Sequence, residues 1–203
     1  MSANPPPAPH RSTLTLRDLC SALVTGGEIS QDDAERILSA NLGADSSRHP
    51  LEIVAIAAPT SLTSGRPLDL DKLTKWLADW AGQPYYHIDP LKIDVPAIAR
   101  AMSYAFAQRH GILAVEIHPE EALIASAEPF RTEWETNLRH VLQKDIKRVV
   151  ANPEDIRRYT VEFYQLASSV SKAGGRQGNA SGNLHNFEQL LDLGSGEDAD
   201  AND

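Results

Sequence analysis

The chain has 203 residues, of which 41% are hydrophobic and 23% charged, and its formal net charge at pH 7 is −9. This composition is close to the average of globular proteins, so the chain can form one medium domain or two small lobes, each with a core. The acidic balance argues against non-specific nucleic-acid binding, which depends on Lys and Arg beside phosphates. It argues equally against anchoring on an anionic membrane surface.

The one cysteine, Cys20, excludes an internal disulfide, and its apolar surroundings at 19–24 are typical of a small buried side chain. No stretch approaches the roughly 18 apolar residues of a membrane span. Residues 1–12 are proline-rich and lack the apolar region of a secretory signal. We therefore expect residues 1–12 to be disordered and the protein to be cytoplasmic, without direct membrane insertion.

A small helical lobe is predicted over residues 14–58. Apolar spacing indicates a helix over 14–24, and Ser30 is placed to cap a second helix over 31–41. The apolar run 51–58 fits a helix or a strand, and we favour a short helix. The stretch 59–68, rich in Pro, Ser, Thr and Gly, is predicted to be a linker or surface loop.

The most regular part, 69–168, is predicted to be a compact α+β domain in which a short mixed or antiparallel sheet packs against helices. Helical spacing of apolar residues and Gly or Pro boundaries mark the helices, and close-spaced apolar runs mark the strands. The predicted helices are 69–81, 95–109, 131–143 and 153–168, and the predicted strands are 85–89, 112–118, 122–127 and 145–151.

Residues 173–203 are predicted to be a flexible acidic linker. Its first part is the glycine-rich sequence GGRQGNASGN and its last part is the acidic sequence GSGEDADAND. Between them, residues 184–193 (LHNFEQLLDL) form a short amphipathic segment.

The sequence has no motif that would hold a cofactor, a metal or a nucleophile. It contains no G-x-x-x-x-G-K-[ST], no H-E-x-x-H, no C-x-x-C and no G-x-S-x-G, and none of its seven histidines lies four residues from another. We therefore predict no catalytic, cofactor-binding or metal-binding residue in this chain, and no enzyme activity.

Four apolar residues are predicted to contact a protein partner. Trp76 and Trp80 lie four residues apart on the helix 69–81, where core packing and a partly exposed aromatic patch are the alternatives. Leu19 and Leu23 share one face of the first helix. A two-helix unit of that size cannot bury enough surface to be stable alone, so this face must dock on the rest of the chain or on a partner.

An ordered set of short motifs resembles the N-terminal domain of the type II secretion and type IV pilus assembly ATPases. No single motif is diagnostic, but their order and spacing over about 68–167 are fairly specific, whereas 14–58 matches loosely. The matching segments are 82–85 (GQPY), 88–94 (IDPLKID), 107–115 (AQRHGILAV), 125–130 (ASAEPF), 146–151 (IKRVVA) and 156–164.

The resemblance implies a non-catalytic docking domain. In that family the domain recruits a hexameric ATPase to the cytoplasmic part of an inner-membrane partner, the L-type secretion protein. ATP and Mg²⁺ would then belong to a motor domain that follows the acidic linker, and the chain would be a fragment truncated before it. Its location would be peripheral to the inner membrane through the partner.

Some relatives bind cyclic di-GMP through a repeated element, R-L-G-x-x-L-x-x-x-G…L-x-x-x-L-x-x-Q, which provides the alternative function. This chain departs from the element, since Arg17 is followed by Asp18 and Leu19, and Asn41 replaces the last Gln. A second copy is not recognisable in 48–72. We therefore favour docking over dinucleotide sensing.

Overall fold

Polar side chains cap the four N-terminal helices, which are α1 (Leu16–Thr25), α2 (Gln31–Ala40), α3 (Pro50–Ala57) and α4 (Leu70–Ala81). The computed structural model describes residues 13–42 and 47–174. Thr15 and Asp18 form a capping box at α1, and Ser30 accepts a hydrogen bond from the Asp33 amide at α2. The helices predicted over 14–24, 31–41, 51–58 and 69–81 are thus confirmed.

These four helices form one layer around a shared hydrophobic core, called here the helical layer. Leu19, Leu23 and Leu51 of that core have no exposed surface. Leu73 and Leu77 of α4 belong to the same core, although the sequence assigned α4 to the domain 69–168. The reason is that the apolar face of α4 packs against α3, N-terminal to it in the chain, as well as against β3, whose Val150 belongs to the same core.

The predicted linker 59–68 folds back on the helical layer. Ser61 is buried and donates a hydrogen bond to Glu28, and Thr63 donates to the same carboxylate. A bridge between Thr60 and Pro67 closes the loop. The loop is therefore bonded to the α1–α2 connection. The predicted domain boundaries themselves stay predictions.

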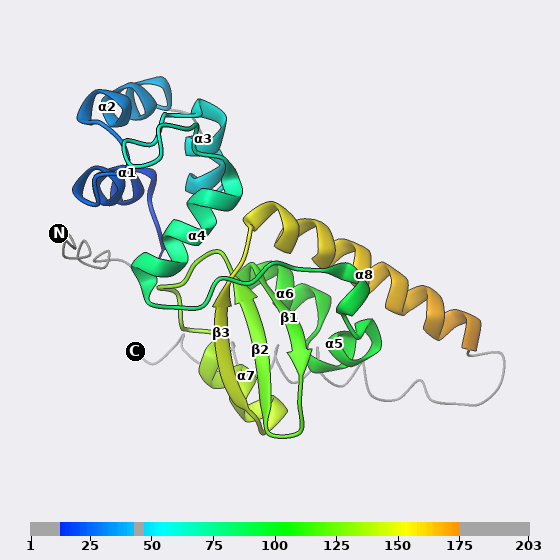
Figure 1. The fold of residues 1–203 in the computed structure, drawn as a ribbon. Coiled ribbons are helices and arrows are strands. Elements are labelled where there is room, and N and C mark those ends of the chain that lie inside the picture. The colour runs from blue at the N-terminus through cyan, green and yellow to red at the C-terminus, as the bar shows by residue number, and fades with distance from the viewer. Residues whose placement is uncertain (1–12, 43–46, 175–203) are drawn as a thin grey trace, which may run out of the picture.

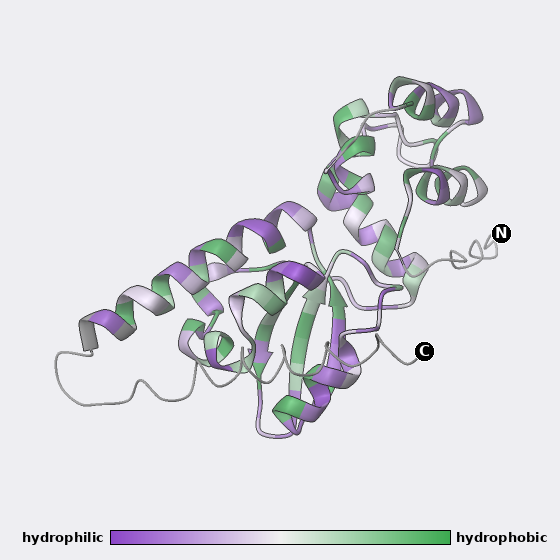
Figure 2. Ribbon diagram, turned by 180° about the vertical axis from the view of Figure 1, so that it is seen from behind, coloured by the Kyte–Doolittle hydropathy of each residue, from purple (hydrophilic) through white to green (hydrophobic). Residues whose placement is uncertain are grey.

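A three-stranded mixed sheet lies at the centre of the second part of the molecule, called here the sheet domain. β1 (Ile112–Ile117) and β2 (Glu121–Ser126) form an antiparallel hairpin, and β3 (Asp145–Val150) pairs with β2 in parallel. The β2–β3 connection contains α7 (Glu135–Leu142), and helices gather on one face of the sheet (Figure 2). The predicted α+β class with a short sheet packed against helices is confirmed.

The predicted strand 85–89 is wrong. Only Tyr85 forms a bridge, with Val150 at the free edge of β3, and the chain then leaves the sheet for a 3-10 turn, η1 (Pro90–Lys92). The bridge is parallel and Val150 is the last residue of β3, so the residues that follow Tyr85 have no further strand residues to pair with.

The single helix predicted over 95–109 is also wrong. It is two helices, α5 (Val95–Ala101) and α6 (Tyr104–His110), separated by Met102 in an extended conformation. The Ser103 hydroxyl accepts a hydrogen bond from the Phe106 amide and caps α6. Met102 and Phe106, on either side of the Ser103 cap, are both buried.

The last helix, α8 (Pro153–Gly174), is longer than the predicted 153–168. Ile156, Tyr159 and Phe163 bury its first half in the sheet domain, beside α5 and α6. Its last turns project past the rest of the molecule (Figure 1). Within 13–42 and 47–174, no helix is long and apolar enough to cross a membrane. The predictions for 1–12 and 175–203 lie outside the described residues.

The contrast between a buried and an exposed leucine tests this core. Leu113 of β1 has no exposed surface, whereas Leu91 is 94% exposed. We expect Leu113→Ala to lower the free energy of unfolding by about 2–5 kcal/mol, because it leaves a cavity. Leu91→Ala, the matched control, should change it by less than about 0.5 kcal/mol. Urea unfolding measures both, and equal losses would contradict the placement of β1 in the core.

Candidate functional site

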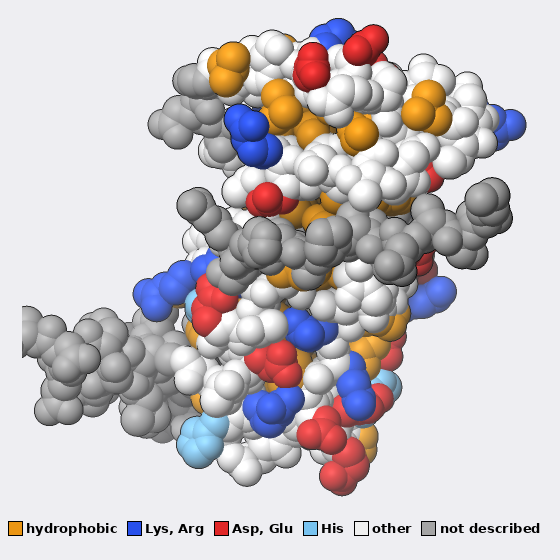
Figure 3. Space-filling view, turned by 90° about the vertical axis from the view of Figure 1, so that its left-hand side faces the viewer, with side chains coloured by type: hydrophobic (Ala, Val, Ile, Leu, Met, Phe, Trp, Pro, Cys, Tyr) orange, Lys and Arg blue, Asp and Glu red, His pale blue; other side chains and the backbone are white. Residues whose placement is uncertain are grey.

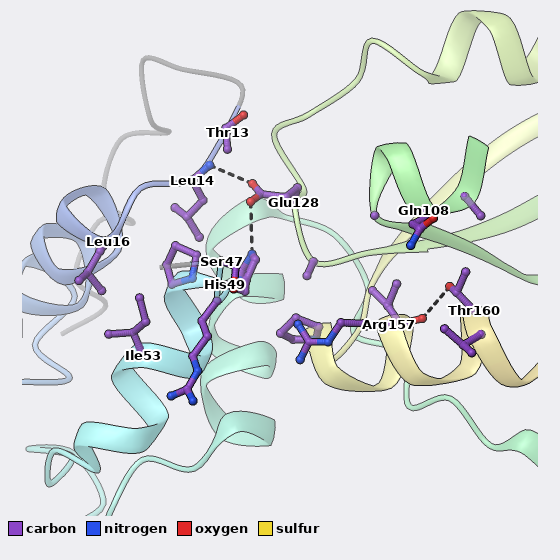
Figure 4. A pocket seen from close by; sticks show the side chains of 18 of the residues that line it. Thr13, Leu14, Leu16, Ser47, His49, Ile53, Gln108, Glu128, Arg157 and Thr160 are labelled. Atoms are coloured by element: carbon purple, nitrogen blue, oxygen red, sulfur yellow. Dashed lines mark hydrogen bonds and ion pairs between the residues drawn. The ribbon is translucent and has the colours of Figure 1, made fainter. Parts of the chain in front are cut away.

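A cavity of about 690 Å³ lies between the helical layer and the sheet domain. Its lining comes from segments far apart in the sequence, and Figure 4 shows side chains of the two parts facing each other across it. Leu16, Ile53 and Tyr104 contribute apolar surface, while Gln108 and Thr160 contribute polar groups. The cavity therefore exists only because the two parts of the molecule are held together.

Glu128 forms one link across the cavity (Figure 4). It follows β2, where the Ser126 hydroxyl accepts a hydrogen bond from its amide. One carboxylate oxygen accepts a hydrogen bond of 2.9 Å from the Leu14 amide, just before α1. The other lies 3.3 Å from His49 Nε2, close enough for an ion pair although the ring nitrogen is not aligned for a hydrogen bond.

His49 reaches Glu128 because its other ring nitrogen is used locally. Nδ1 accepts a hydrogen bond of 3.2 Å from the Leu51 amide and thereby caps α3. An accepting Nδ1 is unprotonated, so in the neutral ring the proton is on Nε2, the atom that faces the carboxylate. Capping of α3 and contact with the sheet domain thus depend on one imidazole.

Arg157 forms a second link, from α8 to α3. Its Nη1 and Nη2 lie 3.1 and 3.4 Å from the two carboxylate oxygens of Glu52, a bidentate arrangement. The Glu52 side chain is only 4% exposed, whereas that of Arg157 is 59% exposed. The pair therefore satisfies a nearly buried carboxylate from the rim of the cavity.

The cavity is more positive than the protein as a whole. Arg48 and Arg157 line it, together with His49, and Glu128 is the acidic residue in the same lining. The chain as a whole has a net charge of −9. Guanidinium groups beside apolar walls suit an anionic ligand with a flat or aromatic part, since arginine both pairs with anions and stacks on rings.

The structure places the four predicted partner-contacting residues within the molecule's own packing. Leu19 and Leu23 are fully buried in the helical layer. The ring centroids of Trp76 and Trp80 are 5.5 Å apart, and Trp80 meets Phe130 of the sheet domain edge-on at 5.1 Å. Both tryptophans are half-buried, and of the two Trp80 packs between the helical layer and the sheet domain. Their role in partner binding stays a prediction.

Cys20 is fully buried, and burial raises the pKa of its thiol to about 11. The thiol is therefore protonated at neutral pH, as expected of a packing residue and unlike a nucleophile. Among the described residues, no group of three His, Cys, Asp or Glu side chains could hold a metal ion.

Sequence reasoning missed the residues that meet at the cavity, namely His49, Glu52, Glu128 and Arg157. Their partners lie 79 to 105 positions apart, so no local spacing relates them. Only Glu52 could have been predicted to take part in an ion pair. It is a charged residue within the apolar run 51–58, and such a residue requires a partner when that run is buried.

Comparison with known proteins gives a family match in the sheet domain. Residues 81–170 match the model of the MshEN domain. The chain is 35% identical over 184 residues to the type IV pilus assembly ATPase TfpB of Acinetobacter baylyi (strain ATCC 33305 / BD413 / ADP1). That alignment covers 89% of this chain and 31% of TfpB, so the chain spans about a third of the length of this relative.

Two solved structures are similar in outline. A structure of MshE with cdg is 18% identical, with a TM-score of 0.48, and the match covers 74% of this chain and 99% of that one. A structure of the N-terminal domain of XpsE is 13% identical, with a TM-score of 0.48, covering 72% and 93%. The family match and the similarity to TfpB confirm the resemblance predicted from the sequence motifs.

The Glu52–Arg157 pair can be tested by removing its cation. We expect Arg157→Met to lower the free energy of unfolding by about 1–3 kcal/mol, because it leaves a nearly buried carboxylate without its main partner. The matched control is Arg139→Met, which removes a half-exposed arginine paired with Glu135 on α7 and should cost less than about 1 kcal/mol. Chemical unfolding at pH 7 measures both. Adding Glu52→Gln to Arg157→Met should restore part of the loss, and an additive loss would contradict the pairing.

Proposed function

We propose, from the match of residues 81–170 to the MshEN domain model, that the chain is the non-catalytic N-terminal docking domain of a secretion ATPase. It recruits the motor to the cytoplasmic domain of the inner-membrane L-type protein and so serves protein secretion. It is cytoplasmic and reaches the membrane only through that partner. ATP and Mg²⁺ act in the motor domain, and this chain binds neither. The family match is the observation that carries the proposal.

Exposed apolar side chains on the helical layer support a protein partner. Ile56 of α3 is 65% exposed and Leu62, in the loop 59–68, is 62% exposed. Figure 3 shows hydrophobic side chains reaching the surface at several places over this layer, the upper part of that view. Apolar groups on a domain surface gain most by burial against another protein.

Binding should be directly measurable with the cytoplasmic domain of the L-type protein. We expect the two proteins to co-elute in gel filtration at tens of micromolar. Ile56→Asp with Leu62→Asp should weaken the complex at least about tenfold, because each puts a charge into a desolvated contact. Leu91→Asp with Val141→Asp places the same charges on exposed positions of the sheet domain and is the control. Absence of a complex, or equal weakening by both variants, would contradict the proposal.

The cavity favours a second candidate function, the sensing of cyclic di-GMP. This ligand combines two phosphates with flat bases, and Arg48 and Arg157 lie beside the apolar walls of the cavity. Against it stands the incomplete sequence element, in which Asp18, Leu19 and Asn41 replace expected residues. We therefore keep it second to docking.

Calorimetry with cyclic di-GMP separates the two candidates. The docking function alone predicts no heat of binding. A micromolar dissociation constant, raised about tenfold or more by Arg48→Ala through loss of a phosphate contact, would support sensing instead. Arg66→Ala removes an exposed arginine from the loop 59–68, away from the cavity lining, and is the control.

A further inference from the structure

The cavity between the helical layer and the sheet domain is open to solvent on one side. Tyr104 of α6 and Val161 of α8 line it and yet are 38% and 36% exposed. Arg157, in the same lining, is more than half exposed. A pocket for a small ligand usually encloses most of that ligand, whereas an open wall suits a side chain that stays attached to a protein outside. The cavity therefore has the form of a docking groove.

One wall of the cavity continues into the apolar surface to which the partner is proposed to bind. Ile53 of α3 lines the cavity, and the exposed Ile56 is three residues further along the same helix. Glu52, which pairs with Arg157 of α8, is four residues before Ile56. Residues three or four apart are neighbours on a helix surface. A partner that covers Ile56 thus also lies beside Ile53 and Arg157.

We propose that the docking partner inserts an acidic, apolar segment into this cavity, with apolar side chains against Ile53 and Val161 and a carboxylate beside Arg157. This inference rests on the proposed docking function and names the chemistry of the partner. Charge complementarity supports it. Glu52 is nearly buried, so the charge that the Glu52–Arg157 pair presents to solvent at the cavity is the cation.

Arg157 has the donors to bind a second carboxylate without releasing Glu52. Two of its N–H groups are directed to the oxygens of Glu52, and a guanidinium has further N–H donors in the same plane. A charge-assisted pair of this kind is strongest where apolar neighbours exclude water, as the cavity walls would do around an inserted segment. Arg48, also in the lining, adds a second cation.

Two valines, one inside the cavity and one outside it, provide the test. Val161 lines the cavity, and Val141 of α7, which is 45% exposed, is not part of the lining. We expect Val161→Glu to weaken binding of the cytoplasmic domain of the L-type protein at least about tenfold. The new carboxylate repels an acidic segment and, one helical turn from Arg157, competes for its guanidinium.

Val161→Lys should weaken binding less than about threefold, because the lysine stem still covers apolar surface and its charge attracts an acid. Val141→Glu and Val141→Lys, the matched controls, should leave the affinity unchanged. Calorimetry measures all four variants, and urea unfolding checks that each is folded.

Equal weakening by Val161→Glu and Val161→Lys would overturn the proposal, because the cavity would then show no preference for an acidic segment. So would an unchanged affinity of the Val161→Glu variant in a complex that Ile56→Asp with Leu62→Asp disrupts, a result that leaves the docking function in place. Absence of any complex with the unmodified chain would contradict both. If Val161→Glu instead abolishes binding of cyclic di-GMP and leaves the affinity for the partner unchanged, the cavity is a dinucleotide site and the proposal fails.

Discussion

The arrangement of the two parts of this molecule depends on two carboxylates that have little access to water. The carboxylates of Glu52 and Glu128 lie where the helical layer contacts the sheet domain. Removing a carboxylate from water costs several kcal/mol unless cations and N–H groups replace the lost hydration. The bidentate Arg157 supplies that replacement for Glu52, and the Leu14 amide and His49 supply it for Glu128. Because each partner comes from the opposite part, any other arrangement would leave a charge unsatisfied.

The same contact links the two candidate functions physically. The cavity is bounded on one side by α1 and α3 and on the other by α6 and α8, so its shape changes with any displacement of the helical layer. A partner docked on Ile56 and Leu62 would act on α3, the helix that His49 caps and that carries Glu52. An anion beside Arg157 would compete with Glu52 for the guanidinium. Docking and ligand binding would therefore be coupled through shared contacts, by differential affinity for two positions of the layer.

The sequence predicted those features of the fold that depend on neighbouring residues, such as helix ends and the hairpin. The Ser30 cap and the glycines at 82 and 111 mark helix boundaries, and the hairpin of β1 and β2 follows from its short connection. The predictions that were wrong or missing all concern tertiary contacts. The apolar spacing of α4 does not determine which elements that helix packs against, and the apolar spacing over 95–109 does not mark the break at Met102. The cavity could not be predicted from the sequence either, because its charged residues are far apart in the chain and come together only in the folded structure.

The length of α8 is a further departure from what its sequence predicts. Its last turns read Ser-Ser-Val-Ser-Lys-Ala-Gly over 168–174, a run rich in serine and ended by glycine, with low intrinsic helix propensity. A helix end of this composition, projecting away from the core, gains little from its own sequence or from the sheet domain. Its apolar residues Leu166 and Val170 nevertheless keep the spacing of the buried turns before them. Because Leu166 and Val170 are about half exposed although they keep this spacing, the last turns of α8 bury little apolar surface against the described residues.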